Sequence, residues 1–397
     1  ALDVYSGGVH VLDNVAYELL LACKENICDS QACPGDIKDE LLKRYTNEAI
    51  DNAFLELKKL YEQGLLYSKF IYADVATSWH KKSVVKAMCL HIAHDCNMRC
   101  KYCFASTGSF EGSRTMMTKE VGEAAIDFVI QNSGKRENIE IDYFGGEPLM
   151  NFEVVKQITD YARRQGELHG KNFRFTITTN GLLLDEDIKA YINENMCNVV
   201  LSLDGRKEIN DEMRLLTGKG AGSCYDSIVD KFIDLAESRE QDNYYVRGTF
   251  TARNLDFAKD VLHLADLGFK QTSIEPVVTD ERHDYALKEE HIDTVCKEYE
   301  KLAKEYIERK KQGKGFNFFH FMIDLSQGPC VIKRLSGCGS GHEYVAVTPE
   351  GDIYPCHQFV GNEEFKMGSV FGGGIDNEIK EKFERSNVYT KPDCQTC

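Results

Sequence analysis

Apolar residues between positions 82 and 312 follow two spacings in turn, a period of two and a repeat of three and four. The first spacing is typical of strands, and the second is typical of helices that turn one face to a core. Strands are expected at 84–91, 139–144, 173–178, 199–203, 244–250 and 272–276, and helices at 120–132, 152–168, 185–195, 224–238, 256–267 and 289–311. Six strands, each followed by a helix, require a parallel sheet with right-handed crossovers. The pattern therefore predicts an α/β fold, a partial (β/α)6 barrel like three quarters of a TIM barrel, with ligands at the C-terminal ends of its strands.

Residues 1–75 follow a different pattern and are expected to form a small module of their own. Its predicted elements are strands at 4–5 and 9–12 around a Gly7–Gly8 turn, helices from Asp13 or Asn14 and over 46–63, and an extended segment over 65–72. The turn residues and the helix start signals support this assignment. Helices flanked by strand pairs indicate a winged-helix-like fold.

Residues 313–397 lose the alternation of strands and helices and become rich in Gly and Cys. Only short strand-like pieces, such as 343–347, remain. Because regularly placed cysteines replace a hydrophobic pattern there, we expect a metal centre to organise a C-terminal domain over this segment.

Charge and composition narrow the functional class. The net charge of −16 over 397 residues argues against a nucleic-acid partner, because phosphate binding needs a basic face. Neither a membrane-spanning run nor a signal peptide is visible, although the first residue is Ala and a short N-terminus could be missing. The 15 cysteines favour metal or cluster binding in a reducing, oxygen-poor cytoplasm over a disulfide framework.

The strongest chemical signal is Cys96-Asn-Met-Arg-Cys100-Lys-Tyr-Cys103, directly after the first predicted strand. Three thiolates at this spacing can bind three irons of a [4Fe–4S] cube, whereas ferredoxin sites supply a fourth cysteine. One iron would then remain open for a substrate or cofactor. The alternative is a zinc site, for which His91 or His94 could act as the fourth ligand.

Polar motifs end the following predicted strands. They are Gly145-Gly146-Glu147-Pro148, Thr178-Thr179-Asn180-Gly181, Ser202-Leu203-Asp204-Gly205 and, more weakly, Glu275-Pro276. Each could also be an ordinary turn. Arg247 lies within the fifth strand, where it points either into the barrel toward an anion or outward to solvent.

The three-cysteine motif resembles that of the radical S-adenosylmethionine (SAM) superfamily. The resemblance implies that the open iron chelates the amino and carboxylate groups of SAM, and that reductive cleavage yields a 5′-deoxyadenosyl radical that removes a hydrogen atom from the substrate. It also implies a set of SAM-binding residues. They are Tyr102 at the adenine, Gly145, Gly146 and Glu147 at the ammonium, Thr178, Ser202 at the ribose, Asp204, and Arg247 at the carboxylate.

A second cysteine pattern, Cys338, Gly351 to Cys356, and Cys394-Gln-Thr-Cys397, resembles the opening of the SPASM extension of radical enzymes that modify peptides. The resemblance assigns Cys330, Cys338 and Cys356 to a first auxiliary [4Fe–4S] cluster, and Cys394 and Cys397 to a second. The chain stops after this CxxC, so either a remainder is missing or the second cluster is incomplete. A zinc site is again the alternative.

The whole chain resembles the maturases of SCIFF peptides ("six cysteines in forty-five residues"), and residues 2–13 carry the narrower similarity. This implies that the N-terminal module is a recognition element that binds the leader of a Cys-rich precursor peptide as an added strand. It also implies a thioether bond from a Cys sulfur to a carbon in the same peptide, with a flavodoxin or ferredoxin as electron donor. Rival interpretations are an anaerobic sulfatase-maturing enzyme and a non-catalytic iron–sulfur or zinc-binding protein.

Overall fold

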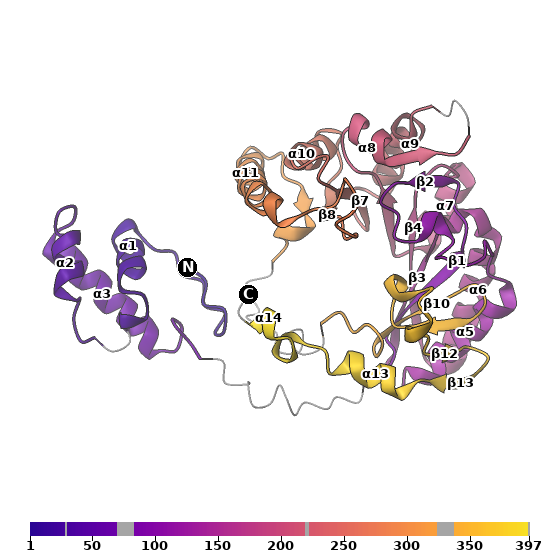
Figure 1. The fold of residues 1–397 in the computed structure, drawn as a ribbon, viewed down its shortest axis with the longest axis horizontal. Helices are drawn as coiled ribbons and strands as arrows, with labels where there is room; N and C mark the ends of the chain where they lie inside the picture. The colour runs from indigo at the N-terminus through magenta and orange to yellow at the C-terminus, as the bar shows by residue number, and fades with distance from the viewer. Residues whose placement is uncertain (28–29, 70–82, 219–221, 324–336, 396–397) are drawn as a thin grey trace. The chain divides into compact units, whose positions relative to one another are not determined.

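The computed structural model of the chain describes residues 1–27, 30–69, 83–218, 222–323 and 337–395. It divides into two compact units (Figure 1). Residues 82–322 and 338–385 form the barrel unit, and residues 1–81, 323–337 and 386–397 are grouped as the terminal unit.

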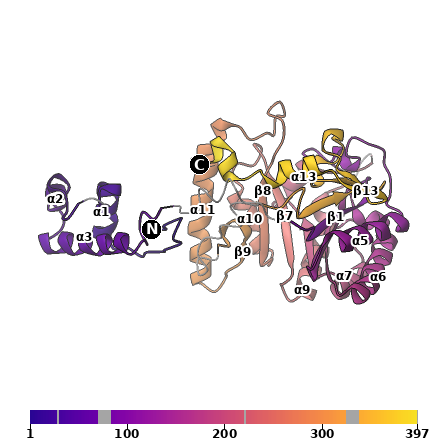
Figure 2. The ribbon, with the colours of Figure 1, turned by 90° about the horizontal axis from the view of Figure 1, so that it is seen from below.

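Six parallel strands form the centre of the barrel unit. In spatial order they are β1 (Ala87–Ala93), β3 (Asn138–Gly145), β4 (Asn172–Thr179), β5 (Asn198–Ser202), β7 (Tyr244–Phe250) and β8 (Gln271–Pro276). Each neighbouring pair is parallel. The sheet curves into an open barrel, and helices cover its outer face (Figures 1 and 2). The predicted partial (β/α)6 barrel is therefore confirmed.

The outer helices agree with the predicted ones to within a few residues. They are α5 (Lys119–Asn132), α6 (Phe152–His169), α7 (Glu186–Asn195), α9 (Cys224–Ser238), α10 (Ala258–Asp266) and α11 (Ile292–Lys311). Side-chain N-caps begin three of them, at Thr118, Asp185 and Ser223, where an oxygen accepts a hydrogen bond from a first-turn amide. Apolar side chains of these helices and of the strands' outer face form one large core.

Alternate residues of each strand point into the barrel. Along β7, Val246 and Phe250 are buried against the helices, whereas Arg247 and Thr249 lie on the inner face. The inner face therefore carries the polar residues, and the outer face carries the core.

The sheet extends beyond the six predicted strands on both sides. Strand β9 (Asn317–Phe318) pairs with β8, and β10 (Tyr344–Val347) pairs in parallel with β1. Antiparallel strands β11 (Asp352–Tyr354), β12 (Gly368–Ser369) and β13 (Gly372–Ile375) follow, and helix α13 (Asn377–Glu384) ends this unit. Residues 338–385 of the predicted C-terminal domain are thus continuous with the barrel, because β10 covers the edge of β1.

A short ribbon that the pattern did not predict crosses the barrel mouth. Strand β2 (Met98–Cys100) pairs antiparallel with β6 (Arg214–Leu216), which follows helix α8 (Lys207–Met213). The register places Cys100 opposite Arg214. Strands of three residues are too short to produce a recognisable spacing.

The terminal unit contains α1 (Asn14–Cys23), α2 (Gly35–Leu41), α3 (Asn47–Glu62) and α14 (Pro392–Gln395). Asp13 caps α1 and Thr46 caps α3, as the predicted helices require. Leu19, Ile50 and Phe54 are buried in a small separate core. Short 3-10 turns complete the chain at 24–27, 106–108, 148–151, 289–291, 319–321, 357–359, 363–365 and 388–390.

The predicted strands of the terminal unit were partly wrong. An antiparallel bridge joins Leu2 to Val9, but the chain turns at 4–6 rather than at Gly7–Gly8. The carboxylate of Asp3 causes this earlier turn, because it accepts hydrogen bonds from the amides of Ser6 (2.8 Å) and Ser68 (3.0 Å). Residues 65–67 are bends instead of a strand, and residues 70–72 lie outside the described ranges.

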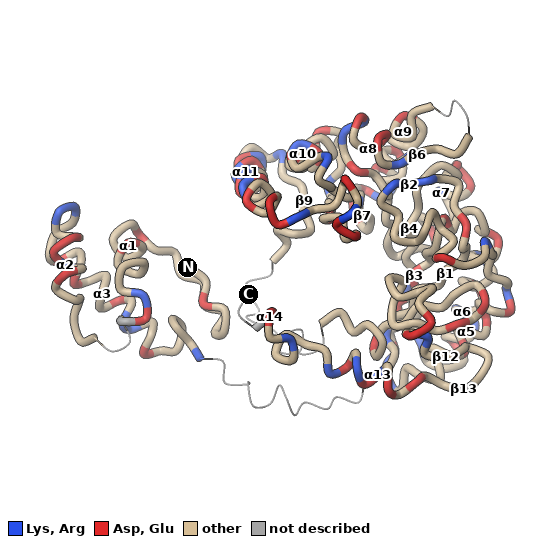
Figure 3. The backbone as a smooth tube through the Cα atoms, viewed as in Figure 1, with Lys and Arg blue, Asp and Glu red and all other residues tan. Residues whose placement is uncertain are grey.

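Four cysteines outside the predicted metal sites differ in exposure. Cys89 and Cys224 are buried, whereas Cys197 and Cys296 are exposed. Among the helices that the structure describes, none combines the length and apolar character needed to span a membrane. Helix α11 carries Lys and Arg interspersed with Asp and Glu, so its charges are of both signs and not only basic (Figure 3).

Candidate active site

A cavity of about 410 Å³ lies at the C-terminal ends of the barrel strands, a size in the range of small-molecule and cofactor sites. All predicted residues of the SAM site except Asp204 line it. They are Cys96, Cys100, Cys103, Tyr102, Gly145, Gly146, Glu147, Thr178, Ser202 and Arg247. The topology therefore brings together residues that are up to 151 positions apart (247 − 96).

Side chains on both sides of Cys96 hold the start of the cysteine loop. Asp95 Oδ1 accepts a hydrogen bond from the Cys96 amide at 2.8 Å and also pairs with Arg114. From the end of β4, Asn180 donates to Asn97 Oδ1 at 2.8 Å, and its Nδ2 lies 3.7 Å from Cys96 Sγ. The loop is thus ordered by the strands that flank it.

The three thiols fit an iron–sulfur cluster. Burial raises the pKa of Cys96 to about 11 and that of Cys100 to about 12, so binding of a metal must displace their protons. Within the described residues, no three His, Cys, Asp or Glu side chains are grouped closely enough to hold a single metal ion. In a [4Fe–4S] cube each thiolate binds a different iron, and Cys96, Cys100 and Cys103 share one cavity wall for that purpose.

Gly145 and Gly146 are required by the packing of the cysteine loop. A Cβ at Gly145 would lie 2.3 Å from the Ala93 carbonyl oxygen, and one at Gly146 would lie 2.1 Å from that of Asp95. Two backbone hydrogen bonds join the end of β3 to the segment that leads into the loop. The Gly146 amide donates to Ala93 O (2.7 Å), and the Glu147 amide donates to Asp95 O (2.9 Å). The glycines therefore let the end of β3 approach the backbone of the loop.

Substituting Gly146 by Ala should displace this loop. We expect a loss of about 1–3 kcal/mol in the free energy of unfolding, as for other overpacked sites, and less iron bound after reconstitution. Gly222→Ala is the matched control, because no atom lies within 4 Å of its added Cβ. Urea denaturation and iron analysis measure both effects. Equal values for the two variants would refute the packing argument.

Both carboxylate oxygens of Glu147 accept hydrogen bonds from other residues of the protein. Its Oε1 accepts from Thr179 Oγ1 (2.8 Å) and the Leu149 amide (3.0 Å), and its Oε2 accepts from the Asn180 amide (2.8 Å). Burial outweighs these hydrogen bonds and raises the pKa of Glu147 to about 7. The side chain is only 1% exposed, so its main visible role is to tie the ends of β3 and β4 together.

Asp204 forms a buried network instead of facing the cavity. Its carboxylate accepts from the Tyr102 hydroxyl (2.8 and 2.9 Å), from Arg214 Nη2 (3.0 Å) and from the Thr249 amide (2.9 Å). The Arg214 guanidinium also lies over the Tyr102 ring, with its carbon 5.6 Å from the ring centroid. Arg214 lines the cavity but was not predicted; it begins β6, whose pairing with β2 places it opposite Cys100.

Arg247 points into the barrel, which decides between the two orientations considered for it. It lines the cavity, and the register of β5 and β7 places it opposite Ser202. A guanidinium and a hydroxyl therefore face the same space, an arrangement suited to an anionic group.

The structure places part of the second cysteine set. Cys356 is partly buried and lies close enough to Cys338, which is exposed, for the two thiols to interact. The two residues after Cys356, His357 and Gln358, line the cavity. Cys394 is exposed on α14 in the terminal unit, whereas Cys330 and Cys397 lie outside the described residues.

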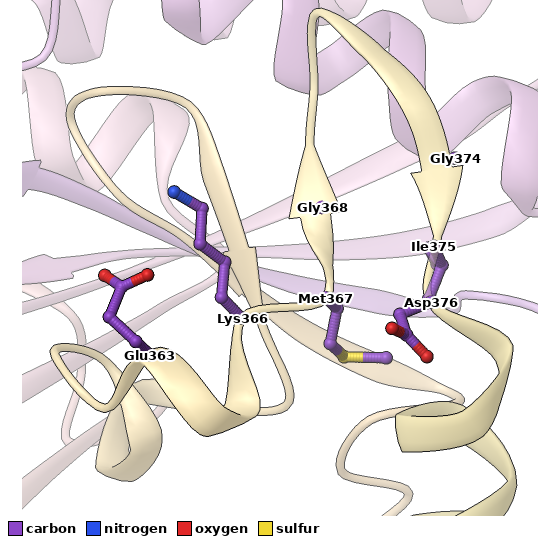
Figure 4. Close-up of a pocket in the computed structure, with 7 residues that line it drawn as sticks. All are labelled: Glu363, Lys366, Met367, Gly368, Gly374, Ile375 and Asp376. Atoms are coloured by element: carbon purple, nitrogen blue, oxygen red, sulfur yellow. The ribbon is translucent and has the colours of Figure 1, made fainter.

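A second cavity of about 460 Å³ lies at the β12–β13 hairpin. Glu363, Lys366 and Asp376 border it, with Met367 between them (Figure 4). Its lining contains none of the predicted site residues, so it has no part in the cysteine site.

Comparison with known proteins agrees with this geometry. The sequence model of the Radical SAM superfamily matches residues 90–234. A cysteine-type anaerobic sulfatase-maturating enzyme of Clostridium novyi is 24% identical over 323 residues, which are 76% of this chain and 82% of that protein.

Two solved structures share the fold. Native anSMEcpe with bound AdoMet has a TM-score of 0.66 at 19% identity, covering 78% of this chain and 86% of that one. Streptococcus suis SuiB bound to precursor peptide SuiA has a TM-score of 0.56 at 15% identity, covering 98% and 87%. Residues 90–234 thus form a domain of the Radical SAM superfamily, a family that uses SAM and a [4Fe–4S] cluster as cofactors.

Proposed function

We propose that the protein installs a thioether cross-link between a Cys sulfur and a carbon of another residue in a ribosomally made precursor peptide. The supporting observation is the position of Cys356. The two residues that follow it line the cavity of Cys96, Cys100 and Cys103. A second cysteine site beside the radical site suits a reaction in which a substrate sulfur and a substrate carbon must meet.

The cavity residues have complementary roles in this proposal. Cys96, Cys100 and Cys103 hold the cluster, and Ser202 and Arg247 offer a hydroxyl and a guanidinium to the ribose and carboxylate of SAM. When bound, SAM and the reduced cluster supply a 5′-deoxyadenosyl radical that removes a hydrogen atom from the substrate. Tyr102 is fixed by Asp204, so its ring can serve as a rigid contact for adenine.

The auxiliary clusters belong to the same proposal. Cys338 and Cys356 are two ligands of the first cluster, and we assign Cys330 as the third and Cys394 with Cys397 to the second. Three protein thiolates would leave one iron of the first cluster for a substrate sulfur, which metal binding would deprotonate.

The terminal unit is proposed to bind the leader of the precursor peptide. Leu2, Val9 and Val11 of its N-terminal bridge region are 52%, 50% and 99% exposed. An apolar, strand-like segment of this kind can take an extended peptide as an added strand. SuiB, which shares the fold at low identity, was solved with a precursor peptide. A flavodoxin or ferredoxin is the proposed electron donor.

A second candidate function is the formation of formylglycine in a sulfatase. It is favoured by the similarity to the sulfatase-maturating enzyme of C. novyi over most of both chains. The products differ chemically. A thioether removes two hydrogen atoms and blocks the Cys thiol to alkylation, whereas formylglycine replaces the sulfur by an aldehyde oxygen.

The test uses the full chain, reconstituted anaerobically with iron and sulfide, reduced, and incubated with SAM and a Cys-rich precursor peptide. Mass spectrometry should show the loss of two hydrogens per cross-link, with the modified Cys resistant to iodoacetamide. A matched sulfatase-derived Cys peptide should remain unchanged. An aldehyde on that peptide would favour formylglycine formation, and no 5′-deoxyadenosine with any peptide would favour a non-catalytic protein.

A further inference from the structure

Glu275 is the second-last residue of β8 and lines the cavity of the cluster cysteines. Both of its carboxylate oxygens are held. Ser273 Oγ donates to Oε1 at 2.5 Å, and His320 Nε2 lies 3.0 Å from Oε2. The side chain nevertheless remains 27% exposed, so a bound molecule can reach it.

His320 is fixed at both ring nitrogens. Its Nδ1 lies 2.8 Å from the Tyr299 hydroxyl, and its ring centroid lies 5.0 Å from that of Phe318. Burial raises the pKa of Tyr299 to about 12, with Glu275 adding to the effect, so Tyr299 remains protonated. Because an ionised carboxylate only accepts hydrogen bonds, His320 must carry its hydrogen on Nε2 and donate it to Glu275.

Charge favours an ionised Glu275. Burial alone would raise its pKa, but hydrogen bonds from Ser273 and His320 and the nearby Arg247 outweigh burial and lower it below the ordinary value. The groups that face Glu275 are thus His320 from the 319–321 turn, Tyr299 behind it on α11, and Arg247 on β7. At neutral pH the carboxylate is available to accept a proton.

The described lining of the cavity contains two carboxylates, and they differ in access. Glu147 is 1% exposed and accepts three hydrogen bonds from β4 and the turn after β3. Glu275 is more exposed and is oriented by side chains that lie behind it. Of the two, Glu275 is the one that a substrate can contact.

From this geometry we infer that Glu275 accepts the thiol proton of the substrate cysteine, and that His320 is its positioning residue. The inference rests on the proposed thioether function. The carbon–hydrogen bond breaks as its hydrogen atom leaves to the 5′-deoxyadenosyl radical, and the sulfur–hydrogen bond breaks as its proton passes to Glu275. A carbon–sulfur bond forms, and the remaining electron goes to a one-electron acceptor of the iron–sulfur class.

Glu275→Gln tests the proton acceptor, with Glu281→Gln as the matched control on an exposed loop position. At pH 7 we expect cross-links per 5′-deoxyadenosine to fall on the order of 100-fold in E275Q, the usual contribution of general base catalysis, and to be unchanged in E281Q. The residual reaction of E275Q should rise with pH as the thiol ionises by itself. A selenocysteine peptide, whose selenol is already ionised, should restore the number of cross-links formed per 5′-deoxyadenosine, which is the coupling of the reaction.

A second readout needs no cofactor. The thiol of a peptide bound to cofactor-free protein is titrated through its alkylation rate, and its pKa should be lower in E275Q, because a neutral amide replaces a like charge. For His320, replacement by Ala should reduce coupling about tenfold, whereas Gln, which keeps a donor toward Glu275, should recover most of it. If the two residues had only a structural role, E275Q would not change the pKa of the thiol, and the Ala and Gln variants of His320 would not differ in coupling.

The outcomes distinguish a failure of the proposed function from a failure of the role assigned to Glu275. If the wild-type enzyme forms no cross-link in any peptide, the proposed function fails. If it does form cross-links, and E275Q matches E281Q in coupling and in thiol pKa, only the assignment of Glu275 is overturned. A folded E275Q that forms no 5′-deoxyadenosine would make Glu275 a cofactor ligand and would equally overturn it.

Discussion

Replacing Cys96, Cys100 and Cys103 together by Ala should abolish 5′-deoxyadenosine formation and leave the fold largely intact. The three thiols are partly buried at the barrel mouth, and Cys96 and Cys100 pack against the edge of the main core without belonging to its fully buried set, so their loss leaves that set unchanged. Without thiolates the loop has no ligands for a cluster, and SAM cannot be reduced. Chromatography of the nucleoside product and circular dichroism of the anaerobically prepared protein measure the two effects.

The double variant Cys197→Ala with Cys296→Ala is the control for this experiment, because both side chains are exposed and neither lines the cavity. It should retain wild-type levels of 5′-deoxyadenosine and iron. Product formation by the triple variant above the background without enzyme would show that the cluster is held elsewhere. Loss of helical signal in the triple variant alone would show that the loop also stabilises the fold.

The barrel could be predicted because its signal is long and repeated. Each strand such as β7 buries alternate residues against helices, so its spacing reports its two faces directly, and the predicted bounds of β7 match the structure. The topology then gathers the C-terminal ends of these strands, which is why the strand-end motifs at Gly145 and Ser202 were expected at one edge, whereas the inward orientation of Arg247 within β7 was left open.

What the sequence could not supply is the pairing of short or distant segments. The β2–β6 ribbon has three residues on each side, yet its register places Arg214 opposite Cys100. Similarly, β10 has the pattern of any short buried strand, and nothing in it indicates that its partner is β1. Arg214 and His320 were therefore missed as site residues, and Glu275 was noted only as a weak strand-end motif, because its contact with His320 is a tertiary one.

The roles of individual motif residues were also less predictable than their location. Gly146 was expected to admit the cofactor, whereas its missing Cβ makes room for the Asp95 carbonyl. Glu147 and Asp204 carry the charge that a SAM site needs, but their oxygens are engaged by protein donors. A motif fixes which residues gather at the barrel mouth, while local hydrogen bonds decide which of them face the cavity.

Asp204→Ala should destabilise the protein more than any other single change considered. The substitution leaves Arg214, 8% exposed, without its carboxylate and the Tyr102 hydroxyl without its acceptor. Removing one partner of a buried ion pair costs about 3–5 kcal/mol, because the remaining charge is desolvated without compensation. Urea denaturation of the cofactor-free protein should show this loss as a lower midpoint. Asp280→Ala, which breaks the exposed pair with Arg282, should leave the urea midpoint almost unchanged.

A double-mutant cycle separates the charge from the packing in this network. Arg214→Met should itself be destabilising, since it leaves Asp204 buried without its cation. Asp204→Ala combined with Arg214→Met removes both charges, so the double variant should be more stable than the sum of the single losses predicts. Additive losses would mean that Asp204 and Arg214 act independently, with Asp204 acting through its other donors, the Tyr102 hydroxyl and the Thr249 amide.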